Sequence, residues 1–369
     1  MSLTALAIVL LVGSFALSAV LTGVVRELAE RIGFVAHPAQ DRYHQRPVAL
    51  GGGIAIITTV LSFLIAAILI VRFVVAPGRF SWLDESVAIH APGFLGKIGQ
   101  LVIVLVCVAA LFVLGLVDDI KRLGPFPKLA VEFAVAVAAA AFADVRVEMF
   151  IHSKLLTTLI SAFWIVLVIN VFNFLDNMDG AAAGIAVIVA AILFTAAASS
   201  GQVFIGAFAL LFTGTLLGFL VFNFPPAKIF MGDAGALPAG FLLALLTLRT
   251  TYYHQAASGQ WYPVLIPLIS MAVPLYDFLS VTFLRISQGK SPFVGDTQHF
   301  SHRLRRRGLT DTQAVLTLYL ATLSTGIGAT FLYQVDLVGA ALIFVQTVMV
   351  LAIIAILETT AQIYPPKAQ

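Results

Sequence analysis

The chain has 369 residues, of which 60% are hydrophobic and only 11% are charged. Soluble domains average about 45–50% apolar and about 25% charged residues, so this composition excludes an ordinary soluble domain and indicates a protein surrounded by lipid. The formal net charge of +3 does not imply nucleic acid, because basic loops beside anionic lipid headgroups explain it equally well. The single cysteine, Cys107, excludes an internal disulfide framework.

Eleven apolar stretches are long enough to cross a bilayer, which takes roughly 20 residues. Backbone polar groups inside a membrane need internal partners, so we expect an all-α, polytopic integral membrane protein forming a single domain over residues 1–369. The fourth stretch is short and the sixth and seventh are nearly continuous, which leaves ten spans as the alternative. The first lacks a basic n-region and a cleavage site, so we expect it to be a retained span. The expected spans cover residues 3–25, 51–75, 98–117, 128–143, 154–172, 181–199, 202–222, 235–253, 262–284, 312–333 and 337–357.

Basic residues are divided unequally between the two sides that eleven spans define. Fifteen of the 21 Lys and Arg residues fall on the side of the loops that follow odd-numbered spans. The positive-inside rule therefore predicts that this side faces the cytoplasm, with the N-terminus outside and the C-terminus inside a plasma membrane. Acidic residues gather on the same side, where no orientation rule demands them, and a bound cation is the simplest reason.

Asp118 and Asp119 end the third span. Adjacent carboxylates repel one another unless a cation or proton lies between them, and Mg²⁺ is usually held by one or two carboxylates together with substrate phosphates. A solvated polar helix end is the alternative.

A second motif contains Asn173, Asp176 and Asp179 at spacing i, i+3, i+6. In a helical turn, adjacent members of such a series share a face. One of the aspartates could simply cap the sixth span, but a cap needs one residue, so three polar groups in Phe- and Leu-rich sequence favour a functional site.

Two further acids lie near the same side. Asp233 stands in the turn Met231–Gly235, whose glycines permit close backbone approach at a helix start that attracts phosphate; a plain N-cap is the alternative. Asp277 lies about two turns inside the end of the ninth span. An intramembrane acid is a functional candidate, although a structural ion pair with Arg285 explains it too.

The loop 289–308 combines histidines and arginines. On a helix starting at His299, that residue and His302 share a face, with Arg303 beside it; Gly308 and Thr310 then fit the end of this helix and a capping box opening the next. A positive-inside anchor explains part of the arginine run but not the paired histidines. A zinc site is conceivable, but the abundant acids favour a hard, oxygen-ligated ion.

Carboxylates, basic groups and glycine turns on one side of a membrane are the components of phosphoryl transfer, where positioning and charge stabilisation carry the catalysis. The rival class is an ion-coupled secondary transporter, whose acids would form a pathway near mid-membrane. Most acids here lie at one surface, and no internal repeat is visible in the sequence.

These motifs, in this order, resemble those of the polyprenyl-phosphate N-acetylhexosamine-1-phosphate transferases, the superfamily of the WecA, TagO and MraY enzymes. Asp118-Asp119 matches the paired acidic motif, Asn173 to Gly180 matches N-x-x-D-x-x-D-G, and Met231 to Gly235 matches M-G-D-x-G. The fifth loop resembles the WecA/TagO branch, because MraY enzymes typically carry three consecutive histidines there. Glu132 departs from the pattern, since glutamine is usual near that position.

The resemblance implies transfer of N-acetylhexosamine-1-phosphate, GlcNAc-1-phosphate first among the candidates, from a UDP-sugar to polyprenyl (undecaprenyl) phosphate, with release of UMP, to begin cell-envelope glycan synthesis. Phospho-MurNAc-pentapeptide transfer is the alternative within the superfamily. Direct attack by the lipid phosphate is favoured over a covalent intermediate, because an ionised phosphate needs no further nucleophile.

The implied cofactor is Mg²⁺, with Mn²⁺ as its substitute. The implied partners are the UDP-sugar, the polyprenyl phosphate and membrane lipids, without nucleic acid; monomer and homodimer both stay open. The implied catalytic residues are Asp118, Asp119, Asp176, Asp179 and His302; the substrate-binding residues are Asn173, Lys128, Asp277, Asp296, His299 and Arg303; and the metal ligands are Asp176, Asp179 and Asp233.

Overall fold

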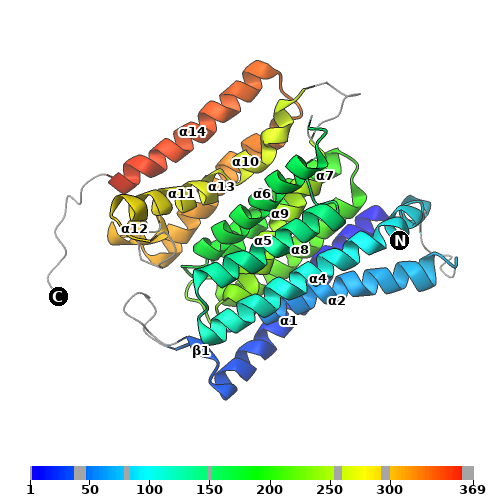
Figure 1. The fold of residues 1–369 in the computed structure, drawn as a ribbon, viewed down its shortest axis with the longest axis horizontal. Coiled ribbons are helices and arrows are strands. Elements are labelled where there is room, and N and C mark those ends of the chain that lie inside the picture. The colour runs from blue at the N-terminus through cyan, green and yellow to red at the C-terminus, as the bar shows by residue number, and fades with distance from the viewer. Residues whose placement is uncertain are drawn as a thin grey trace.

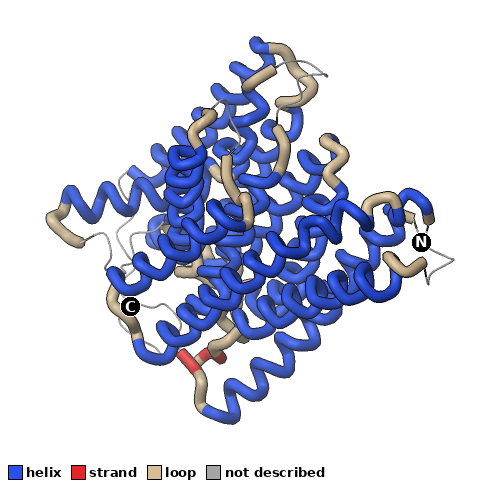
Figure 2. Tube along the Cα trace, turned by 45° about the vertical axis from the view of Figure 1, so that its right-hand side comes forward, coloured by secondary structure: helices blue, strands red, loops and turns tan. Residues whose placement is uncertain are grey.

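Helices account for nearly all regular structure in the computed structural model, which describes residues 2–36, 47–78, 84–147, 151–252, 260–291 and 300–359 (Figures 1 and 2). The α-helices are α1 (Leu3–Ile32), α2 (Gly52–Ile70), α3 (Glu85–Ala88), α4 (Ala91–Lys121), α5 (Pro125–Phe142), α6 (Lys154–Leu175), α7 (Ala181–Ser199), α8 (Val203–Asn223), α9 (Asp233–Arg249), α10 (Ile266–Ser270), α11 (Ala272–Ser287), α12 (Phe300–Arg306), α13 (Asp311–Phe331) and α14 (Leu337–Thr359). A π-helical turn, η1 (Val71–Val75), extends α2, and a 3₁₀ turn, η2 (Tyr262–Leu265), precedes α10.

The prediction of an all-α, polytopic membrane protein is confirmed. Within the described ranges, nine helices are long and apolar enough to cross a membrane, and a bent pair, Tyr262–Ser270 with Ala272–Ser287, adds a tenth span broken by 61°. The stretch expected as the eighth span is α9, which has 17 residues. At 1.5 Å per residue it is about 26 Å long, slightly less than the bilayer core of about 30 Å. The count of eleven therefore depends on α9, whereas length and composition alone support nine or ten.

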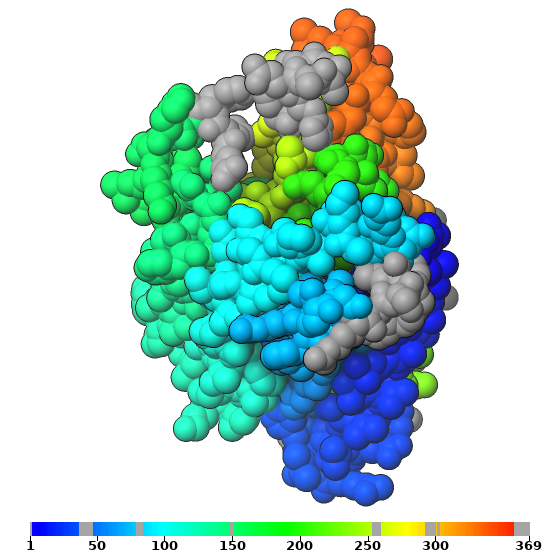
Figure 3. All heavy atoms as spheres, turned by 90° about the vertical axis from the view of Figure 1, so that its right-hand side faces the viewer, coloured from blue at the N-terminus to red at the C-terminus, as the bar shows by residue number. Residues whose placement is uncertain are grey.

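α9 forms the centre of the bundle, and every residue from Ala234 to Thr247 is buried. Small residues let neighbouring helices approach closely, as is usual in membrane bundles. A Cβ atom on Gly240 would lie 2.7 Å from the Cα atom of Ile169 in α6, and one on Gly218 of α8 would lie 2.4 Å from the carbonyl oxygen of Phe15 in α1. α1 and α14 lie on opposite margins of the bundle, as the blue and orange surfaces in Figure 3 show.

The chain direction brings several helix ends to one end of the bundle. α4, α6 and α8 finish there, and α5, α7 and α9 begin there. α4 has 31 residues, about 46 Å at 1.5 Å per residue, so its last turn extends beyond what a bilayer core of about 30 Å needs. The two-stranded sheet of β1 (Val35–Ala36) and β2 (Val48–Ala49) lies at the same end, because Phe230 N–H donates to the carbonyl of Ala49 at 2.9 Å. We call it the acidic end, after Asp118, Asp119, Asp176 and Asp233.

Candidate active site

The turn Met231–Gly235, which starts α9, is packed closely against both α2 and α4. A Cβ atom on Gly53 of α2 would lie 2.2 Å from the backbone nitrogen of Gly235. A Cβ atom on Gly115 of α4 would lie 2.3 Å from the carbonyl carbon of Asp233. Only glycine permits such backbone approach, so the structure gives these glycines a packing role.

Asp119 caps α9 from a neighbouring helix. Its Oδ1 atom accepts a hydrogen bond from the backbone N–H of Asp233 at 2.9 Å, and its Oδ2 atom accepts one from Ala234 at 3.1 Å. The expected alternative, in which Asp233 is the N-cap, is wrong, because Gly232 occupies that position without a side-chain bond. Gly232 has φ +67°, and a Cβ atom there would lie 2.6 Å from Asp119 Oδ2, so the cap leaves no room for a side chain. Asp119 therefore fixes where α9 begins.

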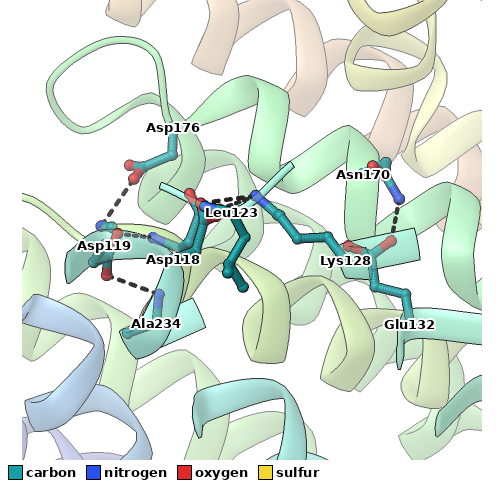
Figure 4. Close-up of polar contacts among 10 residues, drawn as sticks. Asp118, Asp119, Leu123, Lys128, Glu132, Asn170, Asp176 and Ala234 are labelled. Carbon is teal, nitrogen blue, oxygen red and sulfur yellow. Dashed lines mark hydrogen bonds and ion pairs between the residues drawn. The ribbon is translucent and has the colours of Figure 1, made fainter. Parts of the chain in front are cut away.

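Lys128 pairs with two of the predicted acids, Asp118 and Asp233. Figure 4 shows its side chain reaching Asp118. Its ammonium group donates to Asp118 Oδ2 at 3.0 Å and forms a second short ion pair with Asp233. The other oxygen of Asp118 accepts from the backbone N–H of Leu123 at 2.6 Å. The three charged side chains are 15–24% exposed, so the group is partly desolvated yet open to a ligand.

The turn that carries Asp176 and Asp179 is tied to the segment before α9. Asp176 Oδ2 accepts from the backbone N–H of Gly232 at 3.0 Å, and Asp179 Oδ2 accepts from that of Ala227 at 2.8 Å. α6 ends at Leu175, so only Asn173 of the predicted series lies on the helix, and the expectation of one helical face does not extend to Asp179. Tertiary hydrogen bonds, and not helical spacing, bring these carboxylates to the acidic end.

The basic loop comprises residues 289–308, and its described helix, α12, is hydrogen-bonded to α11. Asp277, predicted to bind substrate, is 2% exposed, and its Oδ1 atom accepts from the backbone N–H of Phe300 at 2.7 Å, at the start of α12. One turn further along α11, Ser280 accepts a hydrogen bond of 2.8 Å from an Nη atom of Arg303. Arg285, considered above as a partner of Asp277, has its guanidinium 5.0 Å from the ring centroid of Phe174.

The end of the basic loop follows the sequence prediction closely. Gly308 adopts φ +96° after α12, and Thr310 forms the expected capping box with Gln313 at the start of α13. Arg305 pairs with Asp311 at 3.1 Å. Asp296 and His299 lie outside the described residues, as does the side chain of His302.

The donor set of the acidic end suits a hard divalent cation. Four carboxylates, those of Asp118, Asp119, Asp176 and Asp233, and the ammonium group of Lys128, which pairs with Asp118 and Asp233, give a formal charge of −3. A diphosphate would be repelled from such a site unless a cation compensated the charge. No three His, Cys, Asp or Glu side chains among the described residues converge enough to hold a metal by themselves. Mg²⁺ takes few protein carboxylates and completes its shell with substrate phosphates, so the group fits an ion bound together with a diphosphate.

Comparisons with known proteins agree with this chemistry. Residues 101–251 match the family described as glycosyl transferase family 4, a range that runs from within α4 to just past α9 and contains every carboxylate of the acidic end. The decaprenyl-phosphate N-acetylglucosaminephosphotransferase of Mycolicibacterium smegmatis is 30% identical over 323 residues, which cover 81% of this chain and 75% of that protein. The chain belongs to glycosyl transferase family 4.

Two further relatives of this family 4 protein extend over most of its length. The probable undecaprenyl-phosphate N-acetylglucosaminyl 1-phosphate transferase of Bacillus subtilis is 28% identical over 355 residues, covering 93% of this chain and 88% of that protein. The undecaprenyl-phosphate alpha-N-acetylglucosaminyl 1-phosphate transferase of Escherichia coli K12 is 24% identical over 312 residues, covering 80% and 76%. The resemblance to the WecA/TagO branch is confirmed.

The motifs alone did not predict several polar contacts around the candidate site, including the partner of Glu132 and the roles of Asn223 and Tyr319. Glu132, 1% exposed and one turn after Lys128, accepts a hydrogen bond from the side-chain amide of Asn170 at 2.6 Å. Asn223 accepts from the backbone N–H of Gly180 at 3.0 Å, and the Tyr319 hydroxyl donates to the carbonyl of the same glycine. The sequence signal that could have identified these residues is that each is a polar side chain within an otherwise apolar membrane span.

Proposed function

We propose that this protein transfers N-acetylglucosamine-1-phosphate from UDP-GlcNAc to a polyprenyl phosphate at the cytoplasmic face of the plasma membrane. The three relatives described above are named as transferases of N-acetylglucosamine phosphate that act on undecaprenyl or decaprenyl phosphate. The observation in the structure that supports it best is the pairing of Lys128 with both Asp118 and Asp233, from three different helices, at one end of a membrane bundle. A soluble nucleotide and a membrane lipid can both reach such a place.

In the proposed reaction, an oxygen of the lipid phosphate attacks the phosphorus atom that carries the sugar. The bond from that phosphorus to the bridging oxygen of the donor breaks, and UMP leaves with the bridging oxygen and the electron pair. The products are polyprenyl-diphospho-GlcNAc and UMP. Direct attack needs no side-chain nucleophile, because the lipid phosphate is already ionised.

The side chains have separate tasks in this proposal. One or two of the carboxylates of Asp176, Asp179 and Asp233, together with the donor diphosphate, would hold Mg²⁺, or Mn²⁺ in its place, which would neutralise charge at that diphosphate. Asp118 orients Lys128 so that the ammonium group faces developing negative charge. Asp119 fixes the position of Asp233 through the start of α9. Arg303 and the histidines of the basic loop bind the donor phosphates.

The placement of the acids supports an enzyme over a secondary transporter. Asp118 and Asp119 lie in the last turn of α4, and Asp233 is the first residue of α9, whereas a transport pathway places its acids near mid-membrane.

A donor panel tests the proposal. Purified protein in detergent, with polyprenyl phosphate and Mg²⁺, should release UMP from UDP-GlcNAc faster than from UDP-GalNAc or UDP-MurNAc-pentapeptide. Preference for UDP-MurNAc-pentapeptide would place the protein in the alternative branch, and UMP release without lipid would show that the lipid is not the acceptor.

A further inference from the structure

Tyr319 of α13 contacts the turn that carries Asp176 and Asp179. Its hydroxyl group donates a hydrogen bond of 2.5 Å to the carbonyl oxygen of Gly180, the last residue of that turn. The side chain lies against α7: a Cβ atom on Gly184 would fall 2.0 Å from both the Cζ atom and the hydroxyl oxygen of Tyr319. The two glycines and the tyrosine are therefore fitted to one another.

The same turn is held on its other side by the segment between α8 and α9. Gly180 N–H donates to Asn223 Oδ1 at 3.0 Å, and the Asn223 amide in turn donates to the carbonyl of Ile229 at 2.9 Å. Asp179 accepts from Ala227 in the same segment. Gly180 thus has its N–H bound by α8 and its carbonyl bound by α13.

α13 is also joined to α12, the helix that contains Arg303, Arg305 and Arg306. α12 ends at Arg306, and Arg305 pairs with Asp311, the first residue of α13, at 3.1 Å. Tyr319 is eight residues after Asp311, which is about 12 Å along the helix at 1.5 Å per residue. A short, rigid element therefore runs from the joint between α12 and α13 to the turn of Asp176 and Asp179.

We propose that Tyr319 is a positioning residue that fixes the acidic turn Asp176–Gly180 relative to the basic helix α12, so that the two parts of the site share one geometry. This rests on the proposed function in that the turn and α12 act on the same donor molecule. Small displacements matter in such a site, since a misplacement of about 1 Å can lower a rate about 100-fold. Loss of the hydroxyl group should therefore affect turnover more than donor affinity.

The test compares Tyr319→Phe with Tyr333→Phe. Tyr333 makes the same type of bond, from its hydroxyl to the carbonyl of Thr251 at 3.1 Å, but at the opposite end of the bundle, beyond the last residue of α9. Both variants keep the ring and should unfold at similar temperatures. Tyr319→Phe should lower kcat about tenfold or more and change KM for UDP-GlcNAc less than twofold, whereas Tyr333→Phe should leave both constants unchanged.

A distance measurement separates this inference from the proposed function. Spin labels at Asn177→Cys, in the turn, and Arg306→Cys, in α12, in a Cys107→Ala background, should give a narrow distance distribution that Tyr319→Phe broadens and Tyr333→Phe does not. If Tyr319→Phe broadens the distance distribution but the wild-type protein is inactive on every donor, the proposed function is refuted and the positioning role of Tyr319 is retained. An unchanged distribution in Tyr319→Phe, or equal loss of kcat in both tyrosine variants, would overturn the positioning role.

Discussion

Asp119→Asn should destabilise the protein measurably, because the Asp119 carboxylate caps the N-terminus of α9. The carboxylate accepts two backbone hydrogen bonds, at 2.9 and 3.1 Å. Hydrogen bonds to charged groups contribute about 1.5–3 kcal/mol each. Asparagine keeps one acceptor but places an NH₂ group opposite the N–H of Ala234, so we expect a loss of about 2–3 kcal/mol in the free energy of unfolding, together with a loss of activity as Asp233 shifts.

Substitution of Gly232 provides a control for the role of Asp119 as the cap of α9. Gly232→Ala forces a side chain into φ +67° and to 2.6 Å from Asp119 Oδ2. In Asp119→Ala the clash is absent, so the double variant should be less destabilised than the sum of the two single variants by about 1 kcal/mol, within the usual range for residues in contact. Chemical denaturation in one detergent measures Asp119→Asn, Asp119→Ala, Gly232→Ala and the double variant Asp119→Ala/Gly232→Ala. An inactive Asp119→Asn with wild-type stability would show that Asp119 acts on the substrate and would refute its role as a cap.

Three other predictions concern charge and orientation. Lys128→Met should lower kcat about 100-fold, because the ammonium group between two carboxylates is lost where negative charge develops, and UMP release measures it; near-normal turnover would remove Lys128 from the site. Arg303→Lys should impair turnover although the formal charge is kept, because lysine lacks the planar guanidinium that can bind Ser280 and a phosphate at the same time. Arg307→Lys should leave turnover nearly unchanged in the same assay. Equal, small effects of the two substitutions would mean that the basic loop only anchors the protein to the membrane. In a Cys107→Ala background, Lys121→Cys should react with a membrane-impermeant thiol reagent only from inside the cell and His152→Cys only from outside; the opposite pattern would invert the predicted orientation.

The sequence was sufficient for the helices because the bilayer imposes a simple rule. Apolar stretches of about 20 residues predicted nearly every helix, with ends displaced by a few residues where a helix continues past the membrane, as α4 does to Lys121. The capping box at Thr310 was predictable for the same local reason, since its hydrogen bonds join residues three apart.

The site could be predicted only in part. The motifs identified Asp118, Asp119, Asp176 and Asp233, but their partners lie far along the chain: the bond from Asp233 to Asp119 spans 114 residues. No local pattern shows that Asp119 caps a distant helix. The same limit hid Tyr319, which is one aromatic residue in an apolar span until the fold brings it to Gly180.

Transfer of label from the donor tests the central claim most directly. UDP-GlcNAc labelled with ³²P on the phosphate next to the sugar is incubated with protein, Mg²⁺ and polyprenyl phosphate, and the organic phase is analysed. The proposed reaction predicts that phosphorus label and sugar enter the lipid in equal amounts, that the UMP is unlabelled, and that Lys128→Met slows the transfer about 100-fold. Sugar in the lipid without label would mean that the sugar alone is transferred, and label that stays in the aqueous phase would mean that this protein does not use the lipid as acceptor.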